Sequence, residues 1–346
     1  MSSNDIPQAQ HAWIVIKRGH PSQAVVLQKD FPVSSKLKKG EALVKVHAAA
    51  LNPVGWKIMR LLPNIIAKRP QIAEYDLAGT IADSNGTEFN KGDEIFGWLP
   101  VPLSIKSGQG ALAQYVRLPA DHLVAKPSSI DFIHAAGICL AGMTALQGLK
   151  QAGIEAGQTV FINGGTTAVG SFAIQIAKAK GCNVVATTST PNIDIVKGLG
   201  ADKVIDYKNN PPISHLKENP PTPNFHVIYD TVGTSAELFT ASPAYLAPNG
   251  IFVSVGVTMG GLGNILKSVF QTQLRPSWLG GTNRKFRLVS VNNKKEDLEE
   301  LRDLIGEGKL KPLVDSTFSF DDVLKAYERI MTGRAKGKVA VQVISN

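Results

Sequence analysis

The hydrophobic pattern is clearest between residues 159 and 180, TVFINGGTTAVGSFAIQIAKAK, where it predicts a strand, a glycine-rich turn and a helix in succession. The apolar run 159–162 is typical of a strand buried on both faces of a parallel sheet, and 163–165 interrupts it. In the helix, apolar residues recur at i, i+3, i+4, i+7 and i+8 and form one apolar face: Val169, Phe172, Ala173, Ile176 and Ala177.

Strands and helices alternate through the rest of the second half of the chain. With 159–162, the apolar runs make six candidate strands, and helical patterns separate most of them. This number is what a complete doubly wound parallel sheet of the Rossmann type requires. The further strands are predicted at 183–188, 203–207, 226–230, 250–256 and 285–292.

The first third of the chain has a different pattern, with short β-like runs separated by turn clusters. It predicts a partly open β-barrel, and the change of character places a domain boundary near Ser128. After Lys294 the pattern predicts a helix, a strand, a helix and a last strand, and we expect this tail to return to the first domain. The predicted domains are 1–128, 129–292 and 293–346. The barrel strands are predicted at 12–17, 25–28, 41–50, 76–82, 93–98 and 112–118.

The predicted turn has the properties of a pyrophosphate site. A strand that runs through glycines into a helix presents unpaired N–H groups and the positive end of the helix dipole to one point. The spacing Gly164-x-x-Thr167-x-x-Gly170 is close to a dinucleotide fingerprint, with a threonine where a glycine is usual. A tight turn without a ligand remains the alternative on this motif alone.

The end of the next strand bears on the choice of dinucleotide. An NAD-binding fold places an acid about 20 residues after the first glycine, for the ribose 2′-hydroxyl. Here the chain has Thr188, Ser189 and Thr190, and no acid before Asp194. Since hydroxyls can donate to a 2′-phosphate and a carboxylate would repel it, the sequence favours NADPH over NADH. No lysine or arginine follows directly, so the cation for the phosphate must come from elsewhere.

Composition excludes several classes of function. The 346 residues have a formal net charge of +9, but the basic residues are scattered, which fits an anionic cofactor and a solvated surface better than a nucleic-acid site. The only cysteines, Cys139 and Cys182, exclude a disulfide framework and a four-cysteine zinc site. No long apolar run and no signal-peptide or transit-peptide pattern occurs, so we expect a cytoplasmic protein without membrane insertion.

These residues together resemble the medium-chain dehydrogenase/reductase superfamily, in its zinc-free branch of quinone oxidoreductase-like and enoyl reductase-like proteins. The resemblance implies a GroES-like β-barrel domain, a Rossmann domain and a cleft between them where NADPH meets the substrate. It extends from about Trp13 to Val343. Its motifs are LNPVGWKIM (51–59), YDLAGTI (75–81), KGDEIFGW (91–98), GALAQYVRLPADHLVAKP (110–127), AAGICLAGMTALQGL (135–149), NGGTTAVG (163–170), GADKVIDY (200–207), VIYDTVG (227–233) and GKVAVQV (337–343).

The chain departs from the family pattern at defined positions. Similar proteins usually carry Asp at the position of Gly55 and Gly at the position of Glu74, and often a lysine near Pro191 that holds the 2′-phosphate. Tyr207 matches a tyrosine that stacks or hydrogen-bonds near the adenosine phosphate in similar proteins.

The resemblance also implies the cofactor contacts. These are the turn, the end of the second strand with Tyr207, a residue after the fourth strand, the end of the fifth strand at the carboxyl edge of the sheet, and a lysine near the end of the chain. Besides Thr188, Ser189, Thr190 and Tyr207, the residues at these places are Gly164, Gly165, Thr166, Thr167, Ala168, Val169, Gly170, Val232, Gly256, Val257, Thr258 and Lys336, with Lys338 as a second candidate lysine.

The candidate catalytic residues are Lys57, Asn52 and Thr144. Without cysteine ligands for zinc, hydride transfer to an electron-poor double bond needs hydrogen-bond donors for the developing oxyanion. Asn52 and Lys57 can supply them from a turn after a barrel strand, and Thr144 matches a threonine that faces the nicotinamide in similar proteins. The alternatives are a solvated lysine, a turn asparagine and a threonine bonded to its own helix.

The leading hypothesis is therefore an NADPH-dependent, zinc-independent reductase of quinones or α,β-unsaturated carbonyl compounds. One alternative is an enoyl reductase that acts in trans on acyl chains held by a carrier protein. Another is a catalytically weak NADPH-binding protein with a structural or RNA-binding role. A homodimer formed through the edge strand 285–292 is an expectation from the family.

Overall fold

The computed structural model describes residues 6–233, 235–256, 272 and 282–344. The chain divides into two compact units. Unit 1 comprises Met1–Leu140 and Asn292–Asn346, and unit 2 comprises Ala141–Val291. The chain thus leaves unit 1 within helix α6 (Cys139–Ala152), beyond the boundary predicted near Ser128. The assignment of substrate binding to one unit and cofactor binding to the other stays a prediction.

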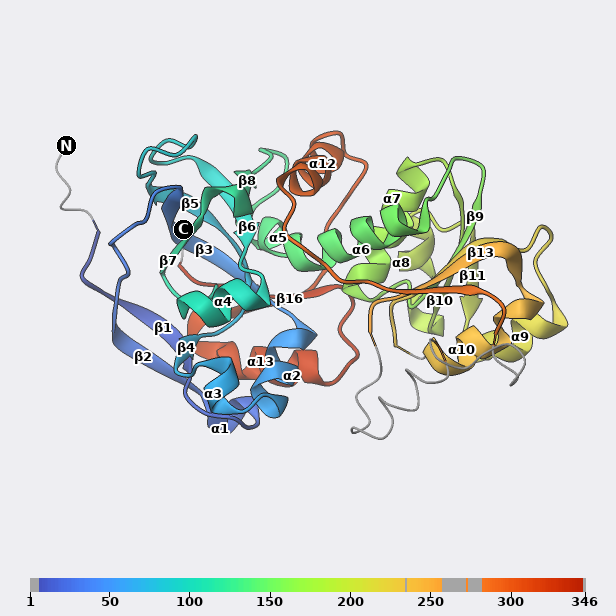
Figure 1. The fold of residues 1–346 in the computed structure, drawn as a ribbon, viewed down its shortest axis with the longest axis horizontal. Coiled ribbons are helices and arrows are strands. Elements are labelled where there is room, and N and C mark those ends of the chain that lie inside the picture. The colour runs from blue at the N-terminus through green and yellow to red at the C-terminus, as the bar shows by residue number, and fades with distance from the viewer. Residues whose placement is uncertain (1–5, 234, 257–271, 273–281, 345–346) are drawn as a thin grey trace. The chain divides into compact units, whose positions relative to one another are not determined.

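Unit 2 is built on a six-stranded sheet whose paired strands are all parallel (Figure 1). The strand order β11-β10-β9-β12-β13-β14 is, in chain order, 3-2-1-4-5-6, the doubly wound Rossmann arrangement. This confirms the predicted α/β fold. The strands are β9 (Thr159–Asn163), β10 (Asn183–Thr188), β11 (Lys203–Asp206), β12 (Phe225–Asp230), β13 (Leu246–Ser254) and β14 (Lys285–Leu288).

Helices connect these strands and bury their apolar faces on the sheet. The predicted helix after β9 is α7 (Ala168–Ala179), which contacts β9 and β10 and buries Phe172, Ala173 and Ile176. A second cluster joins strand aromatics to α9 and α10, with the rings of Phe161 and Phe225 stacked at 5.0 Å. The other helices are α8 (Ile193–Gly198), α9 (Pro212–Glu218) and α10 (Ser235–Ala241). The dimer through β14 stays a prediction.

Unit 1 is β-rich, as predicted. Its larger sheet has the order β15-β16-β3-β5-β6-β8, with β7 paired to β3, and a smaller sheet has the order β2-β1-β4. The tail contributes β15 and β16, and β16 pairs with β3. The strands are β1 (Ala9–Val15), β2 (Val25–Pro32), β3 (Glu41–Leu51), β4 (Gln71–Ile72), β5 (Asp76–Asp83), β6 (Glu94–Trp98), β7 (Tyr115–Pro119), β8 (Leu123–Ala125), β15 (Val314–Ser319) and β16 (Lys338–Gln342).

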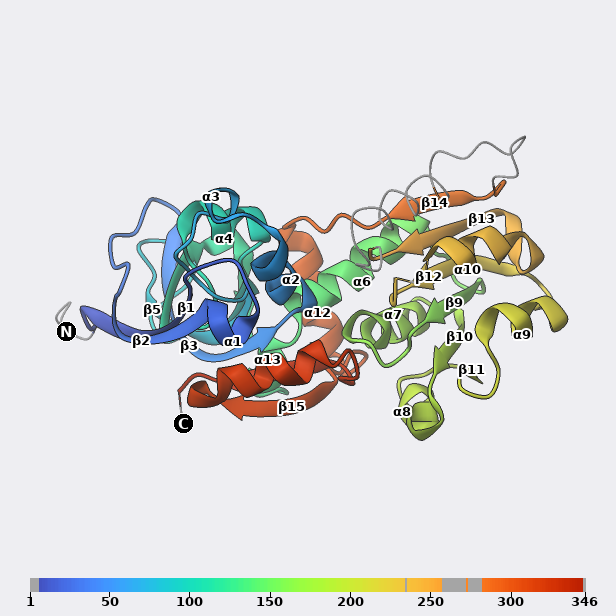
Figure 2. The same ribbon diagram turned by 90° about the horizontal axis from the view of Figure 1, so that it is seen from below.

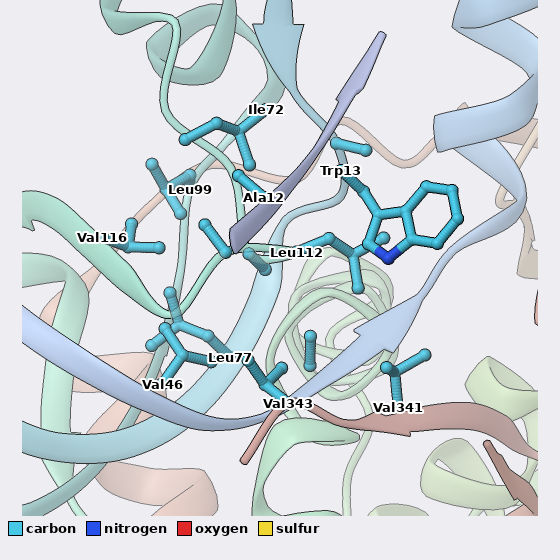
Figure 3. Close-up of a cluster of buried hydrophobic side chains, with 14 of the residues drawn as sticks. Ala12, Trp13, Val46, Ile72, Leu77, Leu99, Leu112, Val116, Val341 and Val343 are labelled. Atoms are coloured by element: carbon cyan, nitrogen blue, oxygen red, sulfur yellow. The ribbon is translucent and has the colours of Figure 1, made fainter. Parts of the chain in front are cut away.

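The core of unit 1 is formed by the alternating inward residues of these strands (Figure 3). Val46, Leu77 and Val116 come from three different strands and are fully buried. Trp13 packs in the same cluster, and its indole N–H donates to the carbonyl of Phe320 at 2.7 Å, which ties the first strand to the tail. The barrel-like unit is therefore closed by residues far apart in sequence.

Several helices of unit 1 were not predicted. The most relevant is α2 (Pro53–Leu61), which follows β3 directly and has proline in its first turn, a common position in helices. It packs with α1 (Pro21–Ala24) and α13 (Val323–Met331) (Figure 2). Helices α3 (Asn64–Ala67) and α4 (Val101–Ser107) were likewise not predicted, whereas α5 (Phe132–Ala136) lies in the stretch 131–148, whose apolar pattern predicts a helix, and α12 (Lys295–Gly306) was also predicted. Within the described ranges, no helix is both long enough and apolar enough to span a bilayer.

Candidate active site

The turn between β9 and α7 is held by its own side chains. Gly164 has φ +92°, a conformation that favours glycine. Thr167 is the N-cap of α7, and its hydroxyl accepts a hydrogen bond from the N–H of Gly170 at 2.9 Å. The same hydroxyl is 2.8 Å from that of Thr231, at the end of β12. The threonine that replaces the usual glycine therefore caps the helix.

Glycine at position 170 allows the helix to approach the turn closely. A Cβ at this position would lie 2.1 Å from the carbonyl oxygen of Gly164, so any side chain would force the helix away. At Gly164, a Cβ would lie 2.5 Å from Cγ2 of Val232, which follows β12. The turn thus meets the end of β12 where the strand order reverses, the position at which open α/β sheets bind ligands.

Three backbone N–H groups of the turn have no acceptor among the described residues. No hydrogen bond leads from the N–H of Thr166, Ala168 or Val169 to another described residue. The N–H groups of Gly164 and Gly165, in contrast, donate to Thr187, to its hydroxyl and its carbonyl respectively. The predicted glycines therefore shape the turn, and the residues after them present the donors that a pyrophosphate needs.

The hydroxyls at the end of β10 lie beside a carboxylate of the adjacent strand β11. Thr190 donates to Oδ2 of Asp206 at 2.6 Å, and this hydrogen bond is the main cause of the lowered pKa of Asp206. Ser189 accepts a hydrogen bond from Asn192, and the hydroxyl of Thr188 is 3.4 Å from that of Thr166. Asp206 was not predicted as a neighbour of Thr190, because it lies on the adjacent strand β11.

Tyr207 follows β11 and is 42% exposed. The ammonium of Lys208 lies 5.6 Å from the centre of its ring, in a cation–π contact. The backbone N–H of Tyr207 donates to the carbonyl of Thr188, so this pair adjoins the end of β10. Lys208 is thus a cation beside the predicted adenosine-phosphate residues.

The other predicted residues of unit 2 lie on different elements. Thr144 lies on α6 and is nearly buried, and its carbonyl accepts a hydrogen bond from Tyr229 at 2.6 Å. Gly256 follows β13, where its carbonyl accepts a hydrogen bond from Ser254. Val257 and Thr258 lie outside the described residues.

A cavity of about 380 Å³ in unit 2 contains none of the predicted residues. Its lining includes Gln158, His226 and Lys285, which stand at the amino ends of β9, β12 and β14. It therefore lies at the edge of the sheet opposite to the glycine turn.

In unit 1, Asn52 takes part in a buried polar network. Its side-chain N–H donates to Oδ2 of Asp76 at 3.0 Å, and its carbonyl oxygen accepts a hydrogen bond from the ammonium of Lys338 at 2.6 Å. Lys338, the second lysine predicted to contact the cofactor, also donates to Oδ2 of Asp76 at 2.9 Å and is buried in this network. Asn52 thus holds two buried charges together, and its role as a donor to substrate stays a prediction. Lys336, which was predicted to contact the cofactor, also lies in unit 1, and its backbone N–H donates to Asp315.

Glu74 joins the same network from the other side. Its Oε2 accepts a hydrogen bond from the backbone N–H of Asn52 at 3.0 Å, and its Oε1 accepts one from the hydroxyl of Tyr327 at 2.8 Å. Burial raises the pKa of Glu74 to about 7, against the opposing effect of these hydrogen bonds. Glu74 was predicted only as a departure from the family pattern, and nothing in that pattern indicates its partner on α13.

Lys57 lies on α2, five residues after Asn52. It is partly buried, and this burial lowers its pKa. Its ammonium is 5.9 Å from the centre of the Trp56 ring. A lysine with a lowered pKa is both a cation for a developing oxyanion and a better proton donor than a solvated lysine.

In the described part of the chain, no group of three or more His, Cys, Asp or Glu side chains has the arrangement of a metal site. Cys139 and Cys182 are buried, and burial raises the pKa of both thiols. Both cysteines therefore have the character of small core residues.

Family models match both units. The model of the alcohol dehydrogenase GroES-like domain matches residues 38–128, and a zinc-binding dehydrogenase model matches residues 199–341. The trans-enoyl reductase pgmF of Aspergillus terreus is 36% identical to this chain, and the match covers 99% of the chain and 98% of the relative. The chain belongs to the medium-chain dehydrogenase/reductase superfamily.

Other relatives place this reductase-like chain in the branch of quinone oxidoreductase-like and enoyl reductase-like proteins, as predicted. The 2-methylene-furan-3-one reductase of Solanum lycopersicum is 31% identical, over 99% of this chain and 81% of that protein. The structure of the quinone oxidoreductase from Coxiella burnetii superposes with a TM-score of 0.80 at 28% identity, covering 97% of this chain and 99% of that one. The protein is therefore an oxidoreductase of a superfamily whose members bind a nicotinamide dinucleotide, and unit 1 contains the predicted GroES-like domain.

Proposed function

We propose that this oxidoreductase uses NADPH, without zinc, to reduce the electron-poor carbon–carbon double bond of an α,β-unsaturated carbonyl compound. The observation that supports the cofactor site most strongly is the turn after β9. There the N–H groups of Thr166, Ala168 and Val169 have no partner among the described residues, and Gly170 lets the helix approach. These donors fit a pyrophosphate.

The choice of NADPH rests on the end of β10 and on Lys208. Thr188, Ser189 and Thr190 present hydroxyls at the place where an NAD-binding fold has an acid. The carboxylate of Asp206 lies beside Thr190. Its oxygens, however, are already engaged, because they accept hydrogen bonds from Thr190, Asn209 and the backbone N–H of Lys208. Lys208, stacked on Tyr207, supplies the positive charge that the sequence left unassigned.

The substrate class rests on the relatives. The names of two of them, the trans-enoyl reductase and the 2-methylene-furan-3-one reductase, describe reduction of a double bond conjugated to a carbonyl group. NADPH bound at the glycine turn would supply a hydride to the β-carbon. The electron pair of the carbon–carbon double bond then forms the double bond of an enolate while the carbonyl π pair moves onto the oxygen, and the enolate takes a proton at the α-carbon, so that one hydride and one proton are added.

The residues of this chain act on the oxygen and the proton. Lys57, with its pKa lowered by burial, stabilises the negative oxygen and is a candidate donor of the proton, solvent being the other. Thr144 is the candidate hydroxyl that orients the nicotinamide or the substrate oxygen. Asn52, the N-cap residue of α2, acts by hydrogen bonding to both Lys338 and Asp76. Each donor to such an oxygen typically contributes about 3 kcal/mol to the stability of the transition state.

A quinone is the second candidate acceptor, because the Coxiella burnetii structure at 28% identity is described as a quinone oxidoreductase. The chemistry is similar, since a quinone also takes a hydride and places negative charge on an oxygen. A carrier-bound enoyl chain is a special case of the first class, and the 36% identity to a trans-enoyl reductase favours it over a structural role.

The test is consumption of NADPH with a free enone, 9,10-phenanthrenequinone and an enoyl chain on a carrier protein, each with and without a chelator. We expect the highest kcat/KM with an enone or enoyl acceptor, no effect of the chelator, and a large loss in Lys57→Ala. No NADPH oxidation with any acceptor would favour a binding protein, and activity abolished by the chelator would contradict the zinc-independent reaction.

A further inference from the structure

The first turn of α2 lacks the acid that such a turn commonly has. Asn52 is the N-cap residue and makes no side-chain capping bond, and the first turn contains no acidic residue. In a capping box, the residue at the third helical position, here Gly55, is an acid or amide that accepts a hydrogen bond from the N–H of the N-cap residue. Glycine cannot do this.

Glu74 supplies the missing acceptor from another segment of unit 1. It lies between β4 and β5, and its Oε2 accepts a hydrogen bond from the N–H of Asn52 at 3.0 Å. This is the N–H that a side chain at position 55 would bind in a capping box. The carboxylate also lies at the positive end of the helix dipole.

Glu74 occupies the space that a side chain at position 55 would need. A Cβ on Gly55 would lie 2.2 Å from Oε1 of Glu74 and 2.9 Å from its Oε2. Gly55 does not have a positive φ, so its backbone does not require glycine. The absence of a side chain at 55 and the presence of the carboxylate at 74 are therefore parts of one arrangement.

The backbone of Glu74 shows that this arrangement has a cost. Glu74 has φ +63°, in the left-handed region that favours glycine. Its carbonyl accepts a hydrogen bond from Ala111 at 2.9 Å, and its side chain is held by Asn52 and Tyr327. Three contacts from different segments thus keep a glutamate where a glycine would fit with less strain.

We propose that Glu74 is a positioning residue, which caps α2 from outside the helix and thereby fixes Asn52 and Lys57 for the reaction. This inference rests on the proposed function for the roles of Asn52 and Lys57, but the capping itself does not. An acid at position 55 together with glycine at position 74 should be able to replace the cap that Glu74 supplies. The Cβ of a side chain at position 55 would lie 2.2 Å from the present position of Oε1 of Glu74, which accepts a hydrogen bond from the hydroxyl of Tyr327 at 2.8 Å.

The test is a double-mutant cycle on the full chain with Gly55→Asp, Glu74→Gly and both together. In Glu74→Gly the N–H of Asn52 loses its acceptor, and in Gly55→Asp the new side chain collides with Glu74. We expect amide hydrogen exchange of residues 52–61 to become at least about tenfold faster in each single variant, and to return to within about threefold of the original rate in the double variant.

Turnover provides the second readout. We expect kcat with an enone to fall at least about tenfold in each single variant, while the Kd for NADPH stays the same, because the glycine turn belongs to unit 2. The double variant should recover most of kcat. If the proposed function is wrong, none of the proteins will turn over, but the exchange rates will still report the cap.

Tyr327→Phe is the matched control, since it removes a hydrogen bond to the same carboxylate but not the one from Asn52. It should leave exchange in residues 52–55 within about threefold of the original rate. If Glu74→Gly does not fold, Glu74→Asn, which tolerates a positive φ and has a side chain one carbon shorter, takes its place. The proposal is overturned if Glu74→Gly leaves the exchange rates and kcat unchanged. It is also overturned if the exchange rates and kcat of the double variant are no closer to the original values than those of the more impaired single variant.

Discussion

The ammonium of Lys338 lies 2.9 Å from Oδ2 of Asp76, and the two side chains are 2% and 0% exposed. Asn52 bonds to both, so the pair is enclosed by polar partners. Such a pair need not stabilise the fold by itself, but removal of one partner leaves a buried charge without compensation.

We therefore predict that Lys338→Met lowers the free energy of unfolding by roughly 3 to 5 kcal/mol. Urea denaturation followed by circular dichroism measures this. Lys336→Met is the control, because that lysine is less buried and should cost less than about 1 kcal/mol. Equal effects of the two substitutions would show that the network around Asp76 does not depend on Lys338.

A second prediction concerns pH. Burial raises the pKa of Glu74 from its ordinary value of 4.5 to about 7, so between these values the folded protein holds a proton that the unfolded chain has lost. The contribution of Glu74 to stability is then fully present below about pH 4.5 and is lost as the pH rises through about 7. The loss is roughly 3 kcal/mol, at about 1.4 kcal/mol per pH unit.

Glu74→Gln isolates this contribution. Since glutamine does not titrate, the variant should gain roughly 3 kcal/mol relative to the original protein between about pH 4.5 and pH 8. Chemical denaturation of both proteins across this range gives the difference directly. A difference that is independent of pH would mean that Glu74 titrates alike in the folded and unfolded chain.

A third prediction concerns the glycine turn. Gly170→Ala places a Cβ 2.1 Å from the carbonyl oxygen of Gly164, so α7 must move away from the turn. We expect the Kd for NADPH, measured by fluorescence titration, to rise at least about tenfold, or 1.4 kcal/mol. Gly198→Ala on α8 is the control, because a Cβ there meets no atom within 4 Å, and it should leave the Kd unchanged. An unchanged Kd in Gly170→Ala would argue against dinucleotide binding at this turn.

A fourth prediction concerns the choice of dinucleotide. If Lys208 is the partner of the 2′-phosphate, Lys208→Ala should raise the KM for NADPH by about tenfold and leave the KM for NADH nearly unchanged. Lys203→Ala is the control, because Lys203 stands at the opposite end of β11. Equal increases with both cofactors would assign Lys208 a structural role.

The sequence predicted the Rossmann sheet well because most of its strands are apolar runs that end at a clear turn; the edge strand β14 (Lys285–Leu288) is half basic and is shorter than the predicted 285–292. It also identified Gly164 and Gly170, whose spacing is local. It did not reveal why Gly55 and Glu74 depart from the family pattern, because their relationship depends on a contact across 19 positions. Lys338, Asp76 and Tyr327 were missed as a network for the same reason, since they come from strands and a helix that only the fold brings together.

The most direct test of the proposed function is the fate of the hydride. The protein is incubated with an α,β-unsaturated ketone and NADPH that carries deuterium at the transferable position of the nicotinamide, and the product is examined by NMR. We predict deuterium at the β-carbon, a solvent-derived hydrogen at the α-carbon, and at least about a hundredfold lower rate in Lys57→Ala. A saturated product without deuterium at the β-carbon, or no product at all, would contradict the proposed reduction of an enone by direct transfer from NADPH.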